Sequence, residues 1–397
     1  MLLIKNGKIM TMAGMTYEHG SILIKDKKII QVGEEIDETQ EAITDIIDAT
    51  NCWVLPGIIE AHCHLGITEA RTGAEGDDCN ESNDPITPQI RALDAINVMD
   101  SAFHNALSSG ITGVMIGPGS SNVVGGQFVF IKTYGRCIDD MVVLEPAAMK
   151  IAFGENIKTN YNDKSMLPSS RMTIAAMLRE ELFKACQYKE NKERSMKSGE
   201  HFDPDFKMES WLPVLNRKIP LKAHVHKAYD ILTAIRIAKE FNLRMTLDHC
   251  TEGHLIAEEI KASGFPAIVG PSLAFRNKIE TQYSDFKTVG ILNKAGIKVA
   301  ITTDHPVTRL HDLCICAGFA AKEGLGIEEG LKAITINAAE ICNVSKRIGS
   351  LEVGKDADIA IFTGNPMEVF TKALYTIIDG KIVYDAKDTA TADKRPY

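Results

Sequence analysis

The sequence lacks the features that mark membrane proteins and nucleic-acid-binding proteins. Its apolar runs end well before the roughly 18 consecutive residues that a membrane-spanning helix needs. Lysine and arginine number 44 against 53 aspartates and glutamates, which gives a formal net charge of −9. No cluster of basic residues builds the stripe that nucleic-acid binding requires. We therefore expect no membrane partner and no nucleic-acid partner.

The sequence also lacks a pattern of paired cysteines. Its nine cysteines are odd in number and scattered, and no CxxC pair occurs. This distribution argues against a zinc ribbon or a disulfide framework and favours reduced thiols in a cytoplasm. The first residues, MLLIKNGKIMTM, place Lys5 and Lys8 inside an apolar run, which predicts a strand and not a signal peptide. We expect a cytoplasmic protein.

Short strands separated by turn residues are present at both ends of the chain. Near the start they are Leu2–Ile4, Lys8–Met10, Ser21–Ile24 and Lys28–Val32, and near the end Asp358–Phe362, Leu374–Ile378 and Lys381–Tyr384. The pattern predicts one small β-sandwich domain formed by residues 1–56 together with 346–397. Two unrelated β appendages are the alternative.

Between these ends, over residues 57–345, apolar strand-like runs alternate with helical stretches, as in a parallel α/β barrel. The eight candidate strands are Ile58–Ala61, Ile111–Ile116, Phe128–Lys132, Ala147–Phe153, Pro220–Val225, Arg244–Asp248, Pro266–Gly270 and Lys298–Thr303. Eight is the number that a closed (β/α)₈ TIM barrel requires. The connection GPGSSNVVGGQ between the second and third strands is too short for a normal helix. Residues 156–216, rich in charged residues, form an insertion that is a mobile solvated segment or a lid.

Histidine and aspartate recur where four of these strands end. The sequences are EAHCH, KAHVH, LDH and TTDHP, and with His254 they hold seven of the eleven histidines. Residues two apart in a strand share a face, and the carboxyl ends of barrel strands meet at one side of the barrel. Neutral imidazoles are good ligands for zinc and similar ions. The pattern therefore predicts a metal site at this side of the barrel.

The same motifs resemble the amidohydrolase superfamily of metal-dependent hydrolases. GIIEAHCHLG, KAHVH, LDH and TTDHP occur in the order typical of that superfamily. The opening LLIKNGKIMTM, the phrase WVLPGIIEAH, the stretch TINAAEICNVSKRIGSLEVGKDADIAIF and the closing DGKIVYD agree with it as well. The similarity covers essentially the whole chain and is closest in character to imidazolonepropionase-like members. It implies a (β/α)₈ barrel with a β-sandwich from both termini.

The resemblance implies a set of ligands for one or two divalent metal ions, most simply Zn²⁺. His62 and His64 would bind one metal with Asp304, while His224 and His249 would bind a second metal or complete a single site. His226 could replace His224 as the ligand.

Members with two metals bridge them with a glutamate or a carboxylated lysine at the end of the fourth strand. Glu155 follows that strand and is our preferred bridge. Lys150, within the strand, and Lys158, in the following loop, are the alternatives if the register differs.

The resemblance further implies hydrolysis of a C–N bond in an amide or cyclic amide of a small-molecule substrate. A bound metal would lower the pKa of a water molecule. Asp304 would accept the proton of that water and return it to the leaving amine. His226 or His254 would stabilise the oxyanion or contact the substrate.

Two other functions are the alternatives to this hydrolysis. Deaminases of nitrogen heterocycles in this superfamily often carry a glutamate three residues after the fifth-strand ligand, but Lys227 stands three residues after His224. A non-catalytic scaffold would not require the complete set of metal-ligating residue types. The sequence leaves the substrate, the metal count and the oligomeric state open, and a homo-oligomer is compatible with it.

Overall fold

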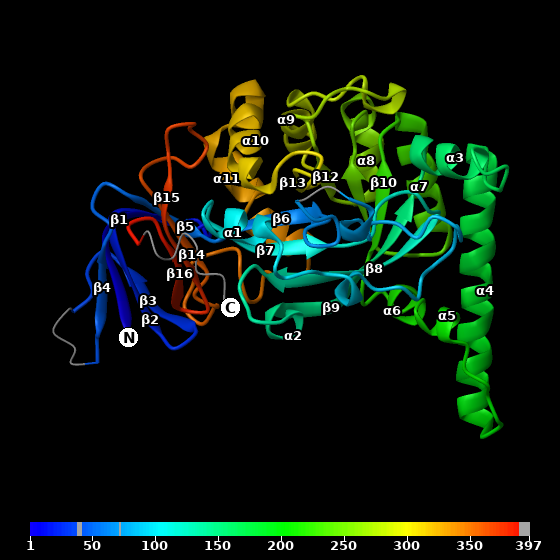
Figure 1. Cartoon of the computed structure of the whole chain (residues 1–397), viewed down its shortest axis with the longest axis horizontal. Helices are drawn as coiled ribbons and strands as arrows, with labels where there is room; N and C mark the ends of the chain where they lie inside the picture. The colour runs from blue at the N-terminus through cyan, green and yellow to red at the C-terminus, as the bar shows by residue number, and fades with distance from the viewer. Residues whose placement is uncertain (38–41, 71–72, 389–397) are drawn as a thin grey trace.

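Two eight-stranded sheets organise the protein. The computed structural model describes residues 1–37, 42–70 and 73–388. In Figure 1, the sheet built from both chain ends lies at one end of the molecule, the second sheet occupies the middle, and the long helix α4 (Arg171–Ser198) stands at the opposite end.

The central sheet forms a nearly closed barrel, which confirms the eight strands that the sequence predicts. The strands follow one another in chain order: β6 (Ile58–Cys63), β7 (Ile111–Ile116), β8 (Val124–Lys132), β9 (Val142–Ala152), β10 (Leu221–Val225), β11 (Met245–His249), β12 (Ala267–Val269) and β13 (Val299–Ile301). Hydrogen bonds join the ends of β6 and β13 across the remaining gap. Thr302 Oγ1 donates to the carbonyl of His62 at 2.6 Å, and the His64 N–H donates to the carbonyl of His305 at 2.8 Å.

The third strand runs against its neighbours, which departs from a uniform (β/α)₈ barrel. β8 pairs antiparallel with both β7 and β9, whereas the other neighbouring strands of the barrel pair in parallel. A parallel crossover needs a dozen or more residues, usually including a helix. The loop at 117–123 is shorter than that, so the chain returns as a hairpin.

Helices that follow the later strands of the barrel cover its outside (Figure 1). They are α7 (Ala228–Glu240), α8 (Ala257–Ser263), α9 (Lys287–Lys294), α10 (Leu313–Ala320), α11 (Ile327–Ala333) and α12 (Ile336–Ile341), with α1 (Ser101–Leu107) and α2 (Ile138–Met141) earlier in the chain. The apolar side of α7, including Ile231, Ala234 and Ala238, is buried in the core. Such a stripe at helical spacing is what holds a helix against a sheet.

The inserted segment at 156–216 is largely helical. It contains most of α3 (Glu155–Asn162), then α4, α5 (Phe206–Glu209) and α6 (Leu212–Leu215). Ser170 caps the start of α4, since its hydroxyl accepts the Thr173 N–H, and Gly199 ends it with a φ of 73°. The buried hydroxyl of Tyr161 donates to Asn122 at 2.7 Å and ties α3 to the loop before β8. A role as a lid stays a prediction.

The terminal sheet combines strands from the start and the end of the chain. Its order is β16-β15-β14-β5-β1-β2-β3, with β4 paired to β1. The strands are β1 (Leu2–Met10), β2 (Thr16–Lys25), β3 (Lys28–Gly33), β4 (Asp45–Asp48), β5 (Trp53–Pro56), β14 (Ile359–Phe362), β15 (Ala373–Ile378) and β16 (Lys381–Asp385). β5 pairs with β14, so the two chain ends form one unit and not two appendages. The exact domain boundaries stay a prediction, and residues 38–41 and 389–397 of the predicted domain lie outside the described residues.

A buried ion cluster joins the barrel to the terminal sheet. Lys132, at the end of β8, lies within 3.0 Å of the carboxylates of Asp356, Asp358 and Asp379. These aspartates precede β14 or follow β15, so the lysine fixes the terminal sheet against the end of β8.

Within the described part of the chain, none of the helices combines the length and apolar character that crossing a membrane would demand.

Candidate metal centre

The histidines singled out in the sequence lie together where the parallel barrel strands end. His62 lies in β6, His224 in β10 and His249 ends β11. Asp304 follows β13 by three residues. The backbones of His249 and Asp304 have φ values of 70° and 52°. Non-glycine residues rarely take this left-handed conformation, and where they do they concentrate at functional sites.

His62, His64 and Asp304 form the first group that could hold a metal. Their ligand atoms all lie within 4.8 Å of one another. Oδ1 of Asp304 is 3.2 Å from Nε2 of His64 and 3.5 Å from Nε2 of His62. All three side chains are largely buried. Two imidazole nitrogens and one carboxylate oxygen converging in this way suit a zinc-like ion.

His224, His226 and His249 form the second group, and their ligand atoms also lie within 4.8 Å of one another. The ring centroids of His224 and His249 are 4.3 Å apart. The ring centroid of His62 is 5.1 Å from that of His249, so the two groups lie side by side.

In three of these rings Nδ1–H donates a hydrogen bond, which turns the Nε2 atom toward the interior of the groups. The partners are Asp248 for His62 (2.6 Å), the carbonyl of Gly117 for His64 (2.7 Å) and the carbonyl of Gly270 for His249 (2.8 Å). Metal-binding histidines typically use their second nitrogen in this manner, because the bond fixes both tautomer and ring orientation.

The residues present fit a metal. Nε2 of His224 and Nε2 of His249 are buried and have no hydrogen-bond partner among the residues that the structure describes. A buried polar atom without a partner costs free energy, and a metal ion would relieve that cost at both atoms. Burial, together with neighbouring positive charge, lowers the pKa of His224 well below its usual value. The ring therefore stays neutral and keeps the lone pair that a metal needs.

His226 differs from His224 because both of its nitrogens face other groups. Nδ1 lies 2.7 Å from the Thr251 hydroxyl, and Nε2 lies 4.0 Å from Oε1 of Glu280. The geometry thus favours His224 and His249 as ligands and leaves His226 beside them.

Lys150 lies in the centre, where the sequence placed it only as an alternative. It is completely buried in β9, and its Nζ is 3.4 Å from Nε2 of His62. Burial lowers the pKa of Lys150 to about 8. Glu155, the preferred bridge, instead begins α3 half-buried, and its backbone N–H donates to Glu280 at 2.8 Å. In the described ranges, the groups able to hold a metal do not include Glu155. Lys158 lies farther along α3, half-buried.

His254 lies apart from both histidine groups. It sits in a short 3₁₀ helix, half-buried, and its Nδ1 is 3.1 Å from the hydroxyl of Thr288 in α9. The contact joins two elements outside the barrel and does not by itself place His254 against a substrate.

Sequence reasoning missed two buried charged residues beneath the centre. Asp248 accepts from Lys222 at 2.9 Å and from Thr246 at 2.6 Å as well as contacting His62. Although burial opposes it, the charge of Lys222 and the contact with His62 hold the pKa of Asp248 well below its usual range. Lys222 could have been found, because it lies two residues before His224 and so shares its face of the strand. Asp248 could not be found in this way, because alternation along a strand predicts that it lies on the face opposite to that of its neighbour His249.

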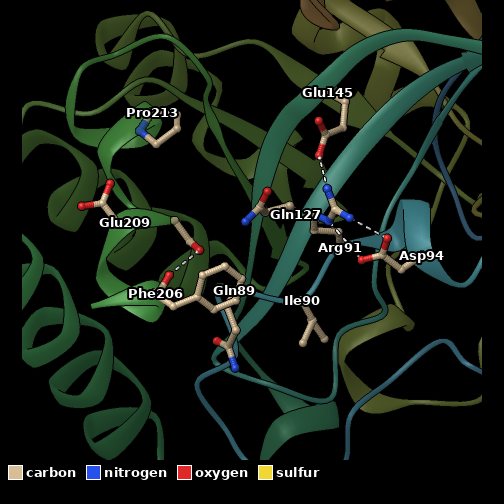
Figure 2. Close-up of a pocket in the computed structure, with 10 residues that line it drawn as sticks. Gln89, Ile90, Arg91, Asp94, Gln127, Glu145, Phe206, Glu209 and Pro213 are labelled. Carbon is tan, nitrogen blue, oxygen red and sulfur yellow. Dashed lines mark hydrogen bonds and ion pairs between the residues drawn. The ribbon is translucent and has the colours of Figure 1, made fainter. Parts of the chain in front are cut away.

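A pocket of about 800 Å³ lies elsewhere, between α5 and the outer side of β8 and β9. Figure 2 shows Arg91 at its wall, paired with Asp94 and Glu145. The described residues that line this pocket include none of the histidines above.

The chain is similar to known amidohydrolases in sequence and in fold. The model of the amidohydrolase family matches residues 232–384. A crystal structure of an amidohydrolase from Thermotoga maritima superposes with a TM-score of 0.94 and is 38% identical, covering 97% of this chain and all of that one. The amidohydrolase tasK of Hapsidospora irregularis is 25% identical over 96% of this chain, which spans only 42% of that longer protein. An imidazolonepropionase of Picrophilus torridus is 26% identical over 91% of each chain.

The Thermotoga match extends over the terminal sheet, the barrel and the insertion alike, at an identity that shows common descent over the full length. The resemblance seen in the sequence motifs is thereby confirmed, and this chain belongs to the amidohydrolase superfamily of metal-dependent hydrolases.

Proposed function

We propose that this protein hydrolyses a C–N bond in an amide or cyclic amide of a small-molecule substrate. The observation that carries the proposal is the convergence of buried imidazole Nε2 atoms and the Asp304 carboxylate at the strand ends. Membership in the superfamily supports the reaction class. The names of the relatives span several reactions, among them those of a 5'-deoxyadenosine deaminase and an imidazolonepropionase.

His62, His64 and Asp304 would hold one metal ion, and His224 and His249 a second, with Zn²⁺ the ion that best suits this mixture of nitrogen and oxygen ligands. A bound divalent ion would lower the pKa of a water molecule and polarise the substrate carbonyl. The protein contributes buried imidazoles that hydrogen bonds hold in fixed orientation.

Asp304 is the residue that we assign to proton transfer. Despite burial, the neighbouring rings of His249 and His64 hold the pKa of Asp304 below its usual range. The carboxylate is therefore ionised and able to accept a proton from the attacking water, then deliver it to the leaving nitrogen. His226 lies beside His224 and His249 and could donate a hydrogen bond to the developing oxyanion.

Lys150 is better placed than Glu155 to join the metal ligands. Its buried amine adjoins His62, and the lowered pKa increases the neutral fraction of that amine at physiological pH. A neutral amine adds carbon dioxide with release of one proton, which yields a carbamate with two ligand oxygens. This carboxylated lysine is the alternative bridge that the family resemblance already allowed.

The heterocycle-deaminase alternative gains no support from the fifth strand. Lys227, at the position where such enzymes often carry an acid, pairs with Glu252 at 2.5 Å and lies over the ring of Tyr283. Its ammonium is engaged in this ion pair.

Metal analysis combined with a hydrolysis panel tests the proposal. Protein purified without chelator should contain one or two equivalents of zinc or a similar ion and should release amine or ammonia from at least one class of amide or cyclic amide. Removal of the metal should abolish that activity, and added metal should restore it. Absence of metal after attempted reconstitution would reject a metal-dependent hydrolase, whereas metal without amide hydrolysis would reject the C–N assignment.

A further inference from the structure

Glu280 is a buried carboxyl group with one oxygen left unsatisfied. It lies in the 3₁₀ helix Ile279–Thr281, in the segment that follows β12, and is 2% exposed. Its Oε1 has no hydrogen-bond partner among the described residues. Burying a carboxylate oxygen without a hydrogen-bond donor costs free energy. A ligand or another compensating contact at this atom would remove that cost.

The position of this oxygen is fixed by the strand ends around the metal centre. Oε2 accepts the backbone N–H of Glu155 at 2.8 Å, directly after β9. Gly154 leaves the space for this contact, because a Cβ atom there would lie 2.5 Å from Oε2. Oε1 then faces Nε2 of His226 at 4.0 Å, beside the second histidine group.

The cationic side chains nearby are already engaged with other partners. The ammonium of Lys278 donates to Asn156. Arg171 binds the neighbouring carboxylate of Asp230 at 3.0 Å. Burial raises the pKa of Glu280, and the negative charges of Glu155 and Asp230 act in the same direction, although the Glu155 N–H and the charge of Lys278 oppose them. A positively charged donor would offset both effects.

Lys227, just past the end of β10, is a further basic group of this region. Its ammonium bonds Glu252 at 2.5 Å, and the other oxygen of Glu252 accepts the N–H of Ala228 at 2.9 Å. Glu252 is thus a buried carboxylate of the same region with both oxygens satisfied, in contrast to Glu280.

We propose that Oε1 of Glu280 binds a primary ammonium group of the substrate, next to the carbonyl that faces the histidines. This inference rests on the proposed C–N hydrolase function and adds a substrate class, amides that carry an ammonium group close to the scissile bond. Glu280 is then a specificity-determining residue that contacts substrate and takes no part in proton transfer.

The test compares amides that differ only in the ammonium group. L-Leucinamide and 4-methylpentanamide form one such pair, and further amino-acid amides with their deaminated counterparts extend the panel. The wild-type holoenzyme should favour the ammonium member by about tenfold or more in kcat/KM, the range of one charge-assisted hydrogen bond. The Glu280→Gln variant keeps an oxygen for the Glu155 N–H and should reduce the preference to about twofold or less.

Glu252→Gln is the matched control and should retain the wild-type preference, even if its stability falls. A preference that survives in Glu280→Gln, or that is absent from the wild type, would overturn the inference. Hydrolysis of both members of each pair at equal rates would leave the C–N hydrolase function standing and reject only the role of Glu280.

Binding separates the two proposals if neither member is hydrolysed. Calorimetric titration of the holoenzyme with L-leucinamide and 4-methylpentanamide measures recognition without turnover. Binding of the ammonium member alone, lost in Glu280→Gln, would support the ammonium site although the hydrolase proposal fails for this class. Equal binding of both members, or none across the panel, would reject the ammonium site.

Discussion

Nδ1 of His62 lies 2.6 Å from Oδ2 of Asp248, a contact between the first barrel strand, β6, and the sixth, β11. The same carboxylate forms an ion pair with the ammonium of Lys222. A histidine ligand, its orienting acid and a neutralising lysine thus form one buried chain beneath the proposed metal centre. The arrangement links the orientation of His62 to the packing of three strands.

Replacing Asp248 with Asn should weaken metal binding without removing any proposed ligand. The variant loses the charged acceptor that fixes the His62 ring, and such changes typically cost about 10–100-fold in metal affinity. Retained metal after dialysis against graded chelator concentrations measures the effect. Asp230→Asn, which breaks a comparable pair with Arg171, is the control and should bind metal as the wild type does. Equal retention in all three proteins would contradict an orienting role for Asp248.

Lys150→Ala should lower the metal content, whereas Glu155→Ala should leave it unchanged. The amine of Lys150 adjoins His62 inside the barrel, and Glu155 begins a helix outside the histidine groups. Inductively coupled plasma mass spectrometry on protein purified without chelator gives the metal count. Two equivalents falling to one or none in Lys150→Ala would identify the bridge. The reverse result, with metal lost only in Glu155→Ala, would restore the preference drawn from the sequence.

Asp304→Asn should lower kcat by about 10²–10⁴-fold on any amide that the wild type hydrolyses. The amide side chain is of similar size but cannot accept and return a proton. Activity is compared at equal metal occupancy, because Asp304 is also a proposed ligand. Asp94→Asn, at an exposed pair with Arg91, serves as the control. Full activity of Asp304→Asn with metal bound would show that another group moves the proton.

The stabilisation that Asp358 contributes to the folded protein should be lost as the pH rises from about 4 to about 6. Burial raises the pKa of Asp358 to about 6 from an ordinary value of 3.8. The folded protein therefore binds a proton that the unfolded chain releases, and the stabilisation is complete below the lower value and lost as pH rises through the higher one. The shift corresponds to on the order of 3 kcal/mol, at 1.36 kcal/mol for each pKa unit.

Chemical denaturation at pH 4 and pH 7 tests this sign. The free energy of unfolding of the wild type minus that of Asp358→Asn should fall as pH rises. Asp356 provides an internal contrast, because Lys28 and Lys132 lower its pKa to about 2 despite partial burial, and its stabilisation is lost only as pH falls through that value. A difference that is constant with pH, or that grows, would contradict the assignment for Asp358.

Gly154→Ala should destabilise the protein by about 1–3 kcal/mol, the usual cost of a strained backbone. The residue has a φ of 100°, and the new Cβ atom would meet Oε2 of Glu280 at 2.5 Å. Gly264→Ala is the matched control, since its φ is 73° but nothing lies within 4 Å of the added atom. Thermal or chemical unfolding of both variants should show the larger loss for Gly154→Ala. An equal loss of stability in the two variants would mean that the contact with Glu280 adds nothing to the cost of the strained backbone.

The sequence by itself determined the barrel and the set of histidines at its strand ends. It also determined that the two ends of the chain form one sheet. These features depend on local regularities. Apolar runs alternate with helical stretches, residues two apart share a strand face, and parallel strands deliver their last residues to one side of the barrel. His62, His64 and His224 follow these rules directly.

Only the tertiary structure decided which other atoms meet those histidines. The left-handed backbone of His249 lets both it and Asp248 contact the centre, which strand alternation would forbid. The register of β9 against its neighbours brings Lys150 to His62, and the segment after β12 returns to place Glu280 beside His226. Each of these contacts joins residues distant in sequence. Their distances depend on how whole strands and loops pack, and no local pattern in the sequence records that.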